Sequence, residues 1–171
     1  PDTDRIFGEA LDVLRQLGAI IVDPANLPHA GEYDEAEYEV LLYEFKAGLN
    51  AYLSTLGPGA PIRTLEEAIA FNDRNAARVM PYFGQEIFHL AQSKGPLTSP
   101  AYRAALAKCR RLSRELGIDA VMARHRLDAL VAPTGNPAWP IDLVNGDHFT
   151  GSVTTPAAVA GYPHITVPMG L

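Results

Sequence analysis

Apolar side chains recur every three or four residues along much of the chain, which is the spacing of one helix face. The first such segment extends from Asp4 to Leu17 and stops at Gly18, where a left-handed cap is usual. Thr64 and Glu67 have the spacing of a capping box at the start of a later helix. We expect further helices at about 37–53, 64–80, 84–93, 99–116, 119–126 and 155–161.

Three short apolar runs interrupt this pattern and do not alternate with polar residues: Ala19–Val22, Ala129–Ala132 and Ile165–Val167. Continuous apolar runs are typical of strands that are buried on both faces of a parallel sheet. Strands that alternate with helices indicate an α/β architecture. We therefore predict an α/β fold in which the three runs share one incomplete parallel or mixed sheet with helical layers.

The division of the chain follows from this sheet. Residues 1–36 form a helix-strand unit, 37–127 a helical excursion, and 128–171 a strand-loop-helix-strand unit with a pocket loop. Inner strands need neighbours at both edges, so we expect a single partial domain whose ends are cuts within a larger one. The open sheet edges predict pairing with the remaining part of that domain, and would also allow a homo-oligomer.

Composition narrows the function classes. The chain has 171 residues, 47% of them hydrophobic and 20% charged, which is typical of a globular protein. A net charge of -6 argues against a nucleic-acid partner. No apolar run is long enough for a membrane span, and the first residues do not resemble a leader peptide. We expect Cys109 in the core and a cytoplasmic protein, although nothing in the sequence determines the compartment.

Common catalytic motifs are missing from the sequence. Gly151-Ser152 is followed by Val153 and Thr154, so the G-x-S-x-G turn of many serine hydrolases is absent. Zinc-protease, phosphate-loop and dinucleotide motifs are absent too. Asp147-His148 lies in a loop of about twenty residues, a length that is often functional. An unrelated hydrolase using His148 as a base stays open, provided that a nucleophile lies within its reach.

The segment from Asp128 to Leu171, above all GSVTTPAAVAGYPHITVPMG, resembles the C-terminal part of amidase signature hydrolases. FGEALDVLRQLGAIIVD is similar, more weakly, to the helix-strand unit that precedes it in that family. Family members have a large mixed sheet between helical layers and hydrolyse amide bonds by a Ser-Ser-Lys mechanism. The resemblance therefore implies part of a serine amidase that acts on a small-molecule amide and needs no metal or organic cofactor.

The resemblance also assigns a role to the loop. The family's catalytic lysine and serines have no counterpart here, because the contexts of Lys46, Lys94 and Lys108 do not match. We expect the nucleophile to lie N-terminal to this chain, no catalytic residue within it, and no activity from the chain alone. The implied contribution is a wall of the substrate pocket. Its substrate-binding residues are Trp139, Thr150, Ser152 and Val153.

A rival hypothesis from another class is an autonomous helical binding module without catalysis. Its contact surface would be the acidic helix at 37–53 or the arginine-rich side of the helix at 99–116. Such a module should bury its strand edges internally, whereas part of an amidase should leave them open.

Overall fold

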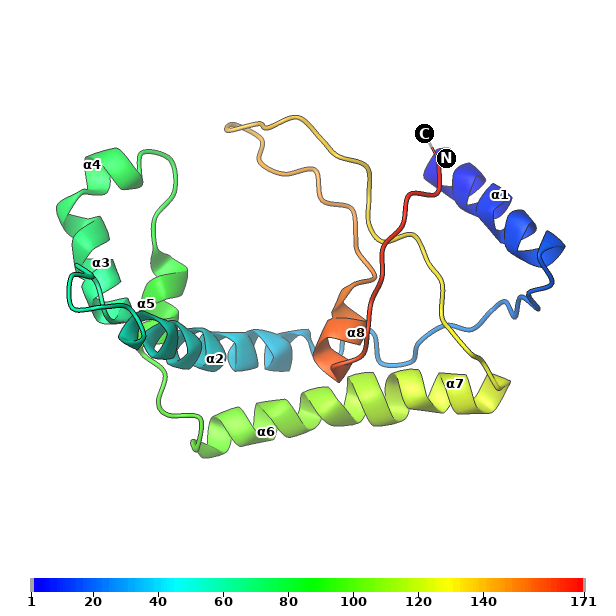
Figure 1. Ribbon diagram of the computed structural model, residues 1–171, viewed down its shortest axis with the longest axis horizontal. Coiled ribbons are helices and arrows are strands. Elements are labelled where there is room, and N and C mark those ends of the chain that lie inside the picture. The colour runs from blue at the N-terminus through cyan, green and yellow to red at the C-terminus, as the bar shows by residue number, and fades with distance from the viewer. Residues whose placement is uncertain (1, 171) are drawn as a thin grey trace. The chain divides into compact units, whose positions relative to one another are not determined.

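The computed structural model describes residues 2–170, which consist of helices joined by irregular segments (Figure 1). Two compact units divide the chain: Asp34–Lys108 forms one, and the residues before and after it form the other. The elements are α1 (Asp2–Gln16), α2 (Asp34–Ser54), α3 (Leu65–Arg74), α4 (Ala76–Val79), α5 (Glu86–Gln92), α6 (Pro100–Cys109), the π-helix η1 (Arg110–Asp119), α7 (Ala120–His125) and α8 (Thr155–Ala160).

The predicted α/β fold is wrong, because no strand is present between residues 2 and 170. The runs at Ala19–Val22, Ala129–Ala132 and Ile165–Val167 have no regular secondary structure, and Ile20 and Ile165 are 91% and 84% exposed. An apolar run indicates side chains that are more stable away from water. A strand also needs a neighbouring backbone to which its N–H and C=O groups can bond. None of the three runs finds that neighbour within the described part of the chain.

The helical unit, Asp34–Lys108, has its core where α2, α3 and α5 meet. Leu42, Leu65, Ile69 and Ala91 are buried there, with Leu49 and Phe88 packed against them. The Thr64 cap at the start of α3 is confirmed, but the Glu67 carboxylate reaches Arg63 and not the Thr64 N–H that a capping box would use. Thr64 Oγ1 accepts the Glu67 N–H at 3.1 Å, and the Glu67 carboxylate accepts the Arg63 N–H at 2.6 Å. The Thr64 bond satisfies one of the backbone donors that the first helical turn leaves free, and the Glu67 bond satisfies the donor just before the cap.

Hydrogen bonds and an ion pair of charged side chains also stabilise this unit. Lys46 Nζ donates to the carbonyl groups of Gln92 and Lys94, both at 2.7 Å, at the end of α5. The Lys94 ammonium group forms an ion pair with Glu39 at 2.7 Å, and the Tyr102 hydroxyl donates to Glu44 at 2.6 Å. Two carboxylates of the acidic helix are therefore occupied within the unit.

The other unit is organised around η1, against which α8 packs. A π-helix closes wider turns than an α-helix, and here it brings Gly117 against the Leu112 carbonyl. A Cβ atom on Gly117 would lie 2.7 Å from that oxygen, so the close approach requires glycine. The Arg114 guanidinium lies 4.8 Å from the centre of the Tyr162 ring, just beyond α8, and the Tyr162 hydroxyl donates to Asp119. That hydrogen bond raises the pKa of Tyr162.

The π-helix changes two details of the sequence interpretation. We expected one helix to end at about Leu116 and another to begin at Asp119, but α6, η1 and α7 follow one another without a break. Cys109 is 2% exposed, which confirms its place in the core. Leu116, which lies seven residues after Cys109 and would share its side of a regular α-helix, is 38% exposed, while Ser113 is buried instead. The wider turns of η1 rotate the side chains that follow Cys109.

Candidate functional site

The predicted pocket loop forms an arch between α7 and α8. Figure 1 shows it as the gold and orange segment that runs out to a tip and returns. At its base, the Val153 N–H donates to the Thr134 carbonyl at 3.1 Å, and Gly135 forms an isolated antiparallel bridge with Ser152. Beyond this bridge the first limb contains Pro137 and Pro140, which have no N–H to donate. Side chains therefore replace the backbone ladder. We call residues 133–154 the arch.

Asn136 joins the two limbs of the arch. Its Oδ1 accepts the Thr150 N–H at 3.3 Å, and its Nδ2 donates to the His148 carbonyl at 3.4 Å. The same Nδ2 donates to the Pro137 carbonyl at 2.9 Å. The side chain thus uses both ends of its amide, within its own limb and across to the other.

Trp139 and Asp147 form a second link, nearer the tip. The indole Nε1–H of Trp139 donates to Asp147 Oδ1 at 3.2 Å, and the Trp139 side chain is half-buried. A tryptophan with an apolar body and a bonded N–H is a common anchor in a loop. The bond holds the N–H edge of the indole in place, and it does not occupy the two faces of the ring.

Asp142 closes the tip of the arch. Its Oδ1 accepts the N–H groups of Val144 and Asn145, both at 2.9 Å, and its Oδ2 accepts from Asn145 Nδ2 at 2.7 Å. The Asn145 side chain, followed by these backbone donors, lowers the pKa of Asp142 below its ordinary value. Gly146 has a φ of +80, a left-handed conformation that favours glycine, and its N–H donates to the Asp142 carbonyl at 3.0 Å.

The four predicted substrate-binding residues all lie in the arch. Trp139 is on the first limb, whereas Thr150, Ser152 and Val153 are on the second and are exposed. Ser152 Oγ donates to the Thr134 carbonyl at 3.2 Å and lies 2.9 Å from the Thr154 hydroxyl. Neither partner is a base that could take its proton, so nothing in this geometry activates Ser152 as a nucleophile.

The Asp147-His148 pair is not arranged as an acid that orients a histidine. The Asp147 carboxylate accepts from Trp139, and His148 contributes its backbone carbonyl to Asn136. Within residues 2–170 the His148 ring forms no hydrogen bond with a nucleophile or with any other group. The unrelated-hydrolase alternative therefore lacks its required contact. The sequence analysis did not identify Asn136, whose amide links the two limbs and which we call the clasp. An asparagine before a proline is nevertheless a common signal for local side-chain bonding in turns.

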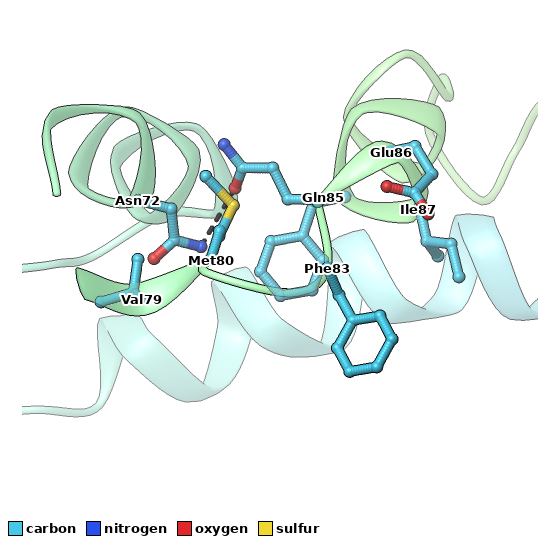
Figure 2. Close-up of a pocket in the computed structure, with 9 residues that line it drawn as sticks. Asn72, Val79, Met80, Phe83, Gln85, Glu86 and Ile87 are labelled. Carbon is cyan, nitrogen blue, oxygen red and sulfur yellow. Dashed lines mark hydrogen bonds between the residues drawn. The ribbon is translucent and has the colours of Figure 1, made fainter. Parts of the chain in front are cut away.

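The two best-formed cavities are lined by other residues, all within the helical unit. The larger holds about 350 Å³ and is shown in Figure 2. At its polar edge Asn72 Nδ2 donates to Gln85 Oε1 at 3.0 Å, and the Gln85 amide donates to Asp73 at 2.7 Å. The smaller, of about 320 Å³, lies beside Lys46 and Lys94, whose ammonium groups already have partners. Neither cavity is lined by any of the four predicted substrate-binding residues, so we keep the candidate site at the arch.

The rest of the described chain limits the chemistry further. Between residues 2 and 170 there is no group of three or more histidine, cysteine, aspartate or glutamate side chains placed to hold a metal ion. No helix in that range is long and apolar enough to cross a membrane.

Comparisons with known proteins agree on one class. No family model matches the chain. It is 32% identical over 165 residues to a probable amidase of Arabidopsis thaliana, covering 94% of this chain and 28% of the relative. It is 27% identical over 180 residues to a glutamyl-tRNA(Gln) amidotransferase subunit of Rhizorhabdus wittichii, covering 99% of this chain and 35% of the relative.

Solved structures give the same answer. A crystal structure of a peptide amidase in complex with the competitive inhibitor chymostatin matches with a TM-score of 0.91 and 47% identity, over 98% of this chain and 34% of that chain. The native peptide amidase of Stenotrophomonas maltophilia matches with a TM-score of 0.87 and 46% identity, over 98% and 33%. The chain thus spans about a third of the relatives that it matches. In both sequence and fold, nearly the whole chain is similar to part of these amidases.

Proposed function

We propose that the chain is part of a serine amidase that hydrolyses the carbon-nitrogen bond of a small-molecule amide. The observation that carries this proposal is the match to a peptide amidase over 98% of the chain at 47% identity. Similarity of that extent includes the arch, so it covers the candidate site as well as the helices around it.

In the proposed mechanism this chain binds the substrate, and the nucleophile lies outside it. A lysine activates the nucleophilic serine through a bridging serine, the serine attacks the amide carbonyl, the amine leaves, and water releases the acid. Protons pass between the lysine and serine side chains, so the mechanism needs no metal or organic cofactor. The partner of this chain is the remaining part of the amidase domain.

The arch supports the binding role because its polar groups are already committed to holding its shape. Ser152 is bonded to Thr134 and Thr154 and has no adjacent base. Trp139 and Val153 supply apolar surface, and Thr150 supplies a hydroxyl on the second limb. Such a surface can discriminate between substrates by shape, while catalysis requires groups that this surface does not present.

Reconstitution tests the proposal. The purified chain should not release amine or ammonia from simple amides. Co-expression with the remainder of the matched peptide amidase, of which this chain covers 34%, should restore hydrolysis. The remainder alone is the control and should be inactive. Turnover by the isolated chain that Ser152→Ala abolishes would contradict the proposal, and so would a stable complex that hydrolyses no amide.

A further inference from the structure

We propose that Asn136 is a positioning residue that sets the separation of the two limbs of the arch and thereby orients Trp139 and Thr150 toward the substrate. The inference rests on the proposed function for its purpose and on the hydrogen bonds of the arch for its geometry. Asn136 was not among the predicted site residues.

The contacts across the arch run in antiparallel order, which we call its register. Position 134 meets 153, position 136 meets 150, position 139 meets 147, and position 142 meets 146. As the position on the first limb advances, its partner on the second limb moves back, by steps of unequal length. The arch therefore behaves as a hairpin, although between positions 136 and 139 its cross-links come from side chains and not from a backbone ladder.

Asn136 links the two limbs near the middle of the arch. Its amide accepts from Thr150 and donates to the His148 carbonyl, so it contacts the second limb on both sides of Phe149. The Trp139-Asp147 bond lies next along the arch. Without the bonds of Asn136, the Trp139-Asp147 bond would have to hold the limbs together beyond the base of the arch, where most of the backbone is exposed.

The side chain acts through others and does not need to touch the substrate. Both ends of its amide are engaged, since the oxygen accepts from Thr150 and the nitrogen donates to two carbonyl groups. A binding surface is effective only when its side chains are held in place before the substrate arrives. Asn136 supplies that restraint for the indole of Trp139, three residues further along.

The first test uses the chain by itself. Trp139 is the only tryptophan in the sequence, so its fluorescence reports on the arch alone. In Asn136→Ala we expect emission to shift to longer wavelength and quenching by acrylamide to rise toward that of the denatured chain. Asn136→Asp keeps an oxygen for the Thr150 N–H but loses the donor, so it should fall between wild type and Asn136→Ala. Far-UV circular dichroism should be the same for all three proteins.

Asn145→Ala is the matched control. It removes the same amide from the same arch, but the lost bond joins Asn145 only to Asp142 within the tip. Its Trp139 emission and quenching should match those of the wild type. If Asn136→Ala leaves Trp139 unchanged, or if Asn145→Ala changes it equally, the positioning role is overturned, whatever the protein catalyses.

The second test uses the reconstituted amidase. Asn136→Ala should raise KM and change the relative kcat/KM of bulky and small amides by about tenfold, with a smaller effect on kcat for small amides. A uniform fall in kcat for every amide, with unchanged preference, would overturn the positioning role. A wild-type complex that hydrolyses no amide would overturn the proposed function instead. Asn136 would then still link the limbs of the arch, but not in order to orient side chains toward an amide substrate.

Discussion

Replacing Gly117 with alanine is expected to destabilise the protein, although alanine is the better helix former. The Cβ atom would lie 2.7 Å from the Leu112 carbonyl oxygen, a distance that real Cβ atoms do not adopt. The oxygen belongs to the backbone of the same π-helix, so it cannot swing aside as a flexible side chain would. Gly117 is also buried, which leaves no room for the turn to expand into solvent.

The magnitude is the difference between two opposing effects. Forcing an extra carbon into a packed position costs about 1–3 kcal/mol. Alanine recovers up to about 1 kcal/mol through its higher helix propensity. With the middle of each range, the net loss should be about 1–2 kcal/mol, which lowers the melting temperature by about 2–8 °C for a chain of this size.

Gly48→Ala provides the matched control for a thermal denaturation experiment followed by circular dichroism. Gly48 lies inside α2, is exposed, and has no atom within 4 Å of the added Cβ. The same substitution should there stabilise the protein by up to about 1 kcal/mol. Equal stabilisation by Gly117→Ala would refute the reasoning, because it would mean that η1 relaxes to a regular α-helix without cost.

Three further predictions concern the arch and the helical unit. In the reconstituted amidase, Val153→Ala should change discrimination between amides of different bulk by about 1–3 kcal/mol, seen in relative kcat/KM, and leave nucleophile activation intact; a uniform fall in kcat would count against the binding role. The Asp142 carboxyl should titrate below pH 3.8 in an NMR experiment. Its contribution to stability is therefore fully present above the pKa of the unfolded chain, and it is lost as the pH falls through the lower pKa of the folded protein. Asn145→Ala should bring that pKa back toward 3.8, and an unchanged pKa would show that the backbone donors suffice. Thr64→Ala removes the cap of α3 and should cost about 1 kcal/mol in chemical denaturation, whereas no change would mean that solvent replaces the cap.

Helices were predictable here because their signals are local. The spacing of apolar residues and the Thr64 cap act within a few residues, and each appears in the structure close to where the sequence indicated it. The break that we expected after Leu116 falls at Gly117, and glycine serves two purposes. It ends helices through a left-handed φ, but it also permits close backbone contact, and at position 117 the second applies.

Pairing across a distance could not be predicted in the same way. The run at Ala129–Ala132 has the composition of a buried strand, yet whether it becomes one depends on a backbone elsewhere, which the run does not encode. The partner of Asp147 was missed for the same reason. Its neighbour in sequence is His148, but the register of the arch brings it to Trp139.

That register in turn depends on groups whose purpose is visible only in the folded arch. Prolines remove the backbone donors that would otherwise align the limbs, so alignment passes to side chains that can donate and accept at once. Asparagine is suited to this task, and Asn136 performs it at the middle of the arch. The resemblance to amidases agrees with the relatives that the chain matches, but it pointed to residues expected to face the substrate. The sequence does not identify the residue that holds them in place, whereas the hydrogen bonds of the folded arch do.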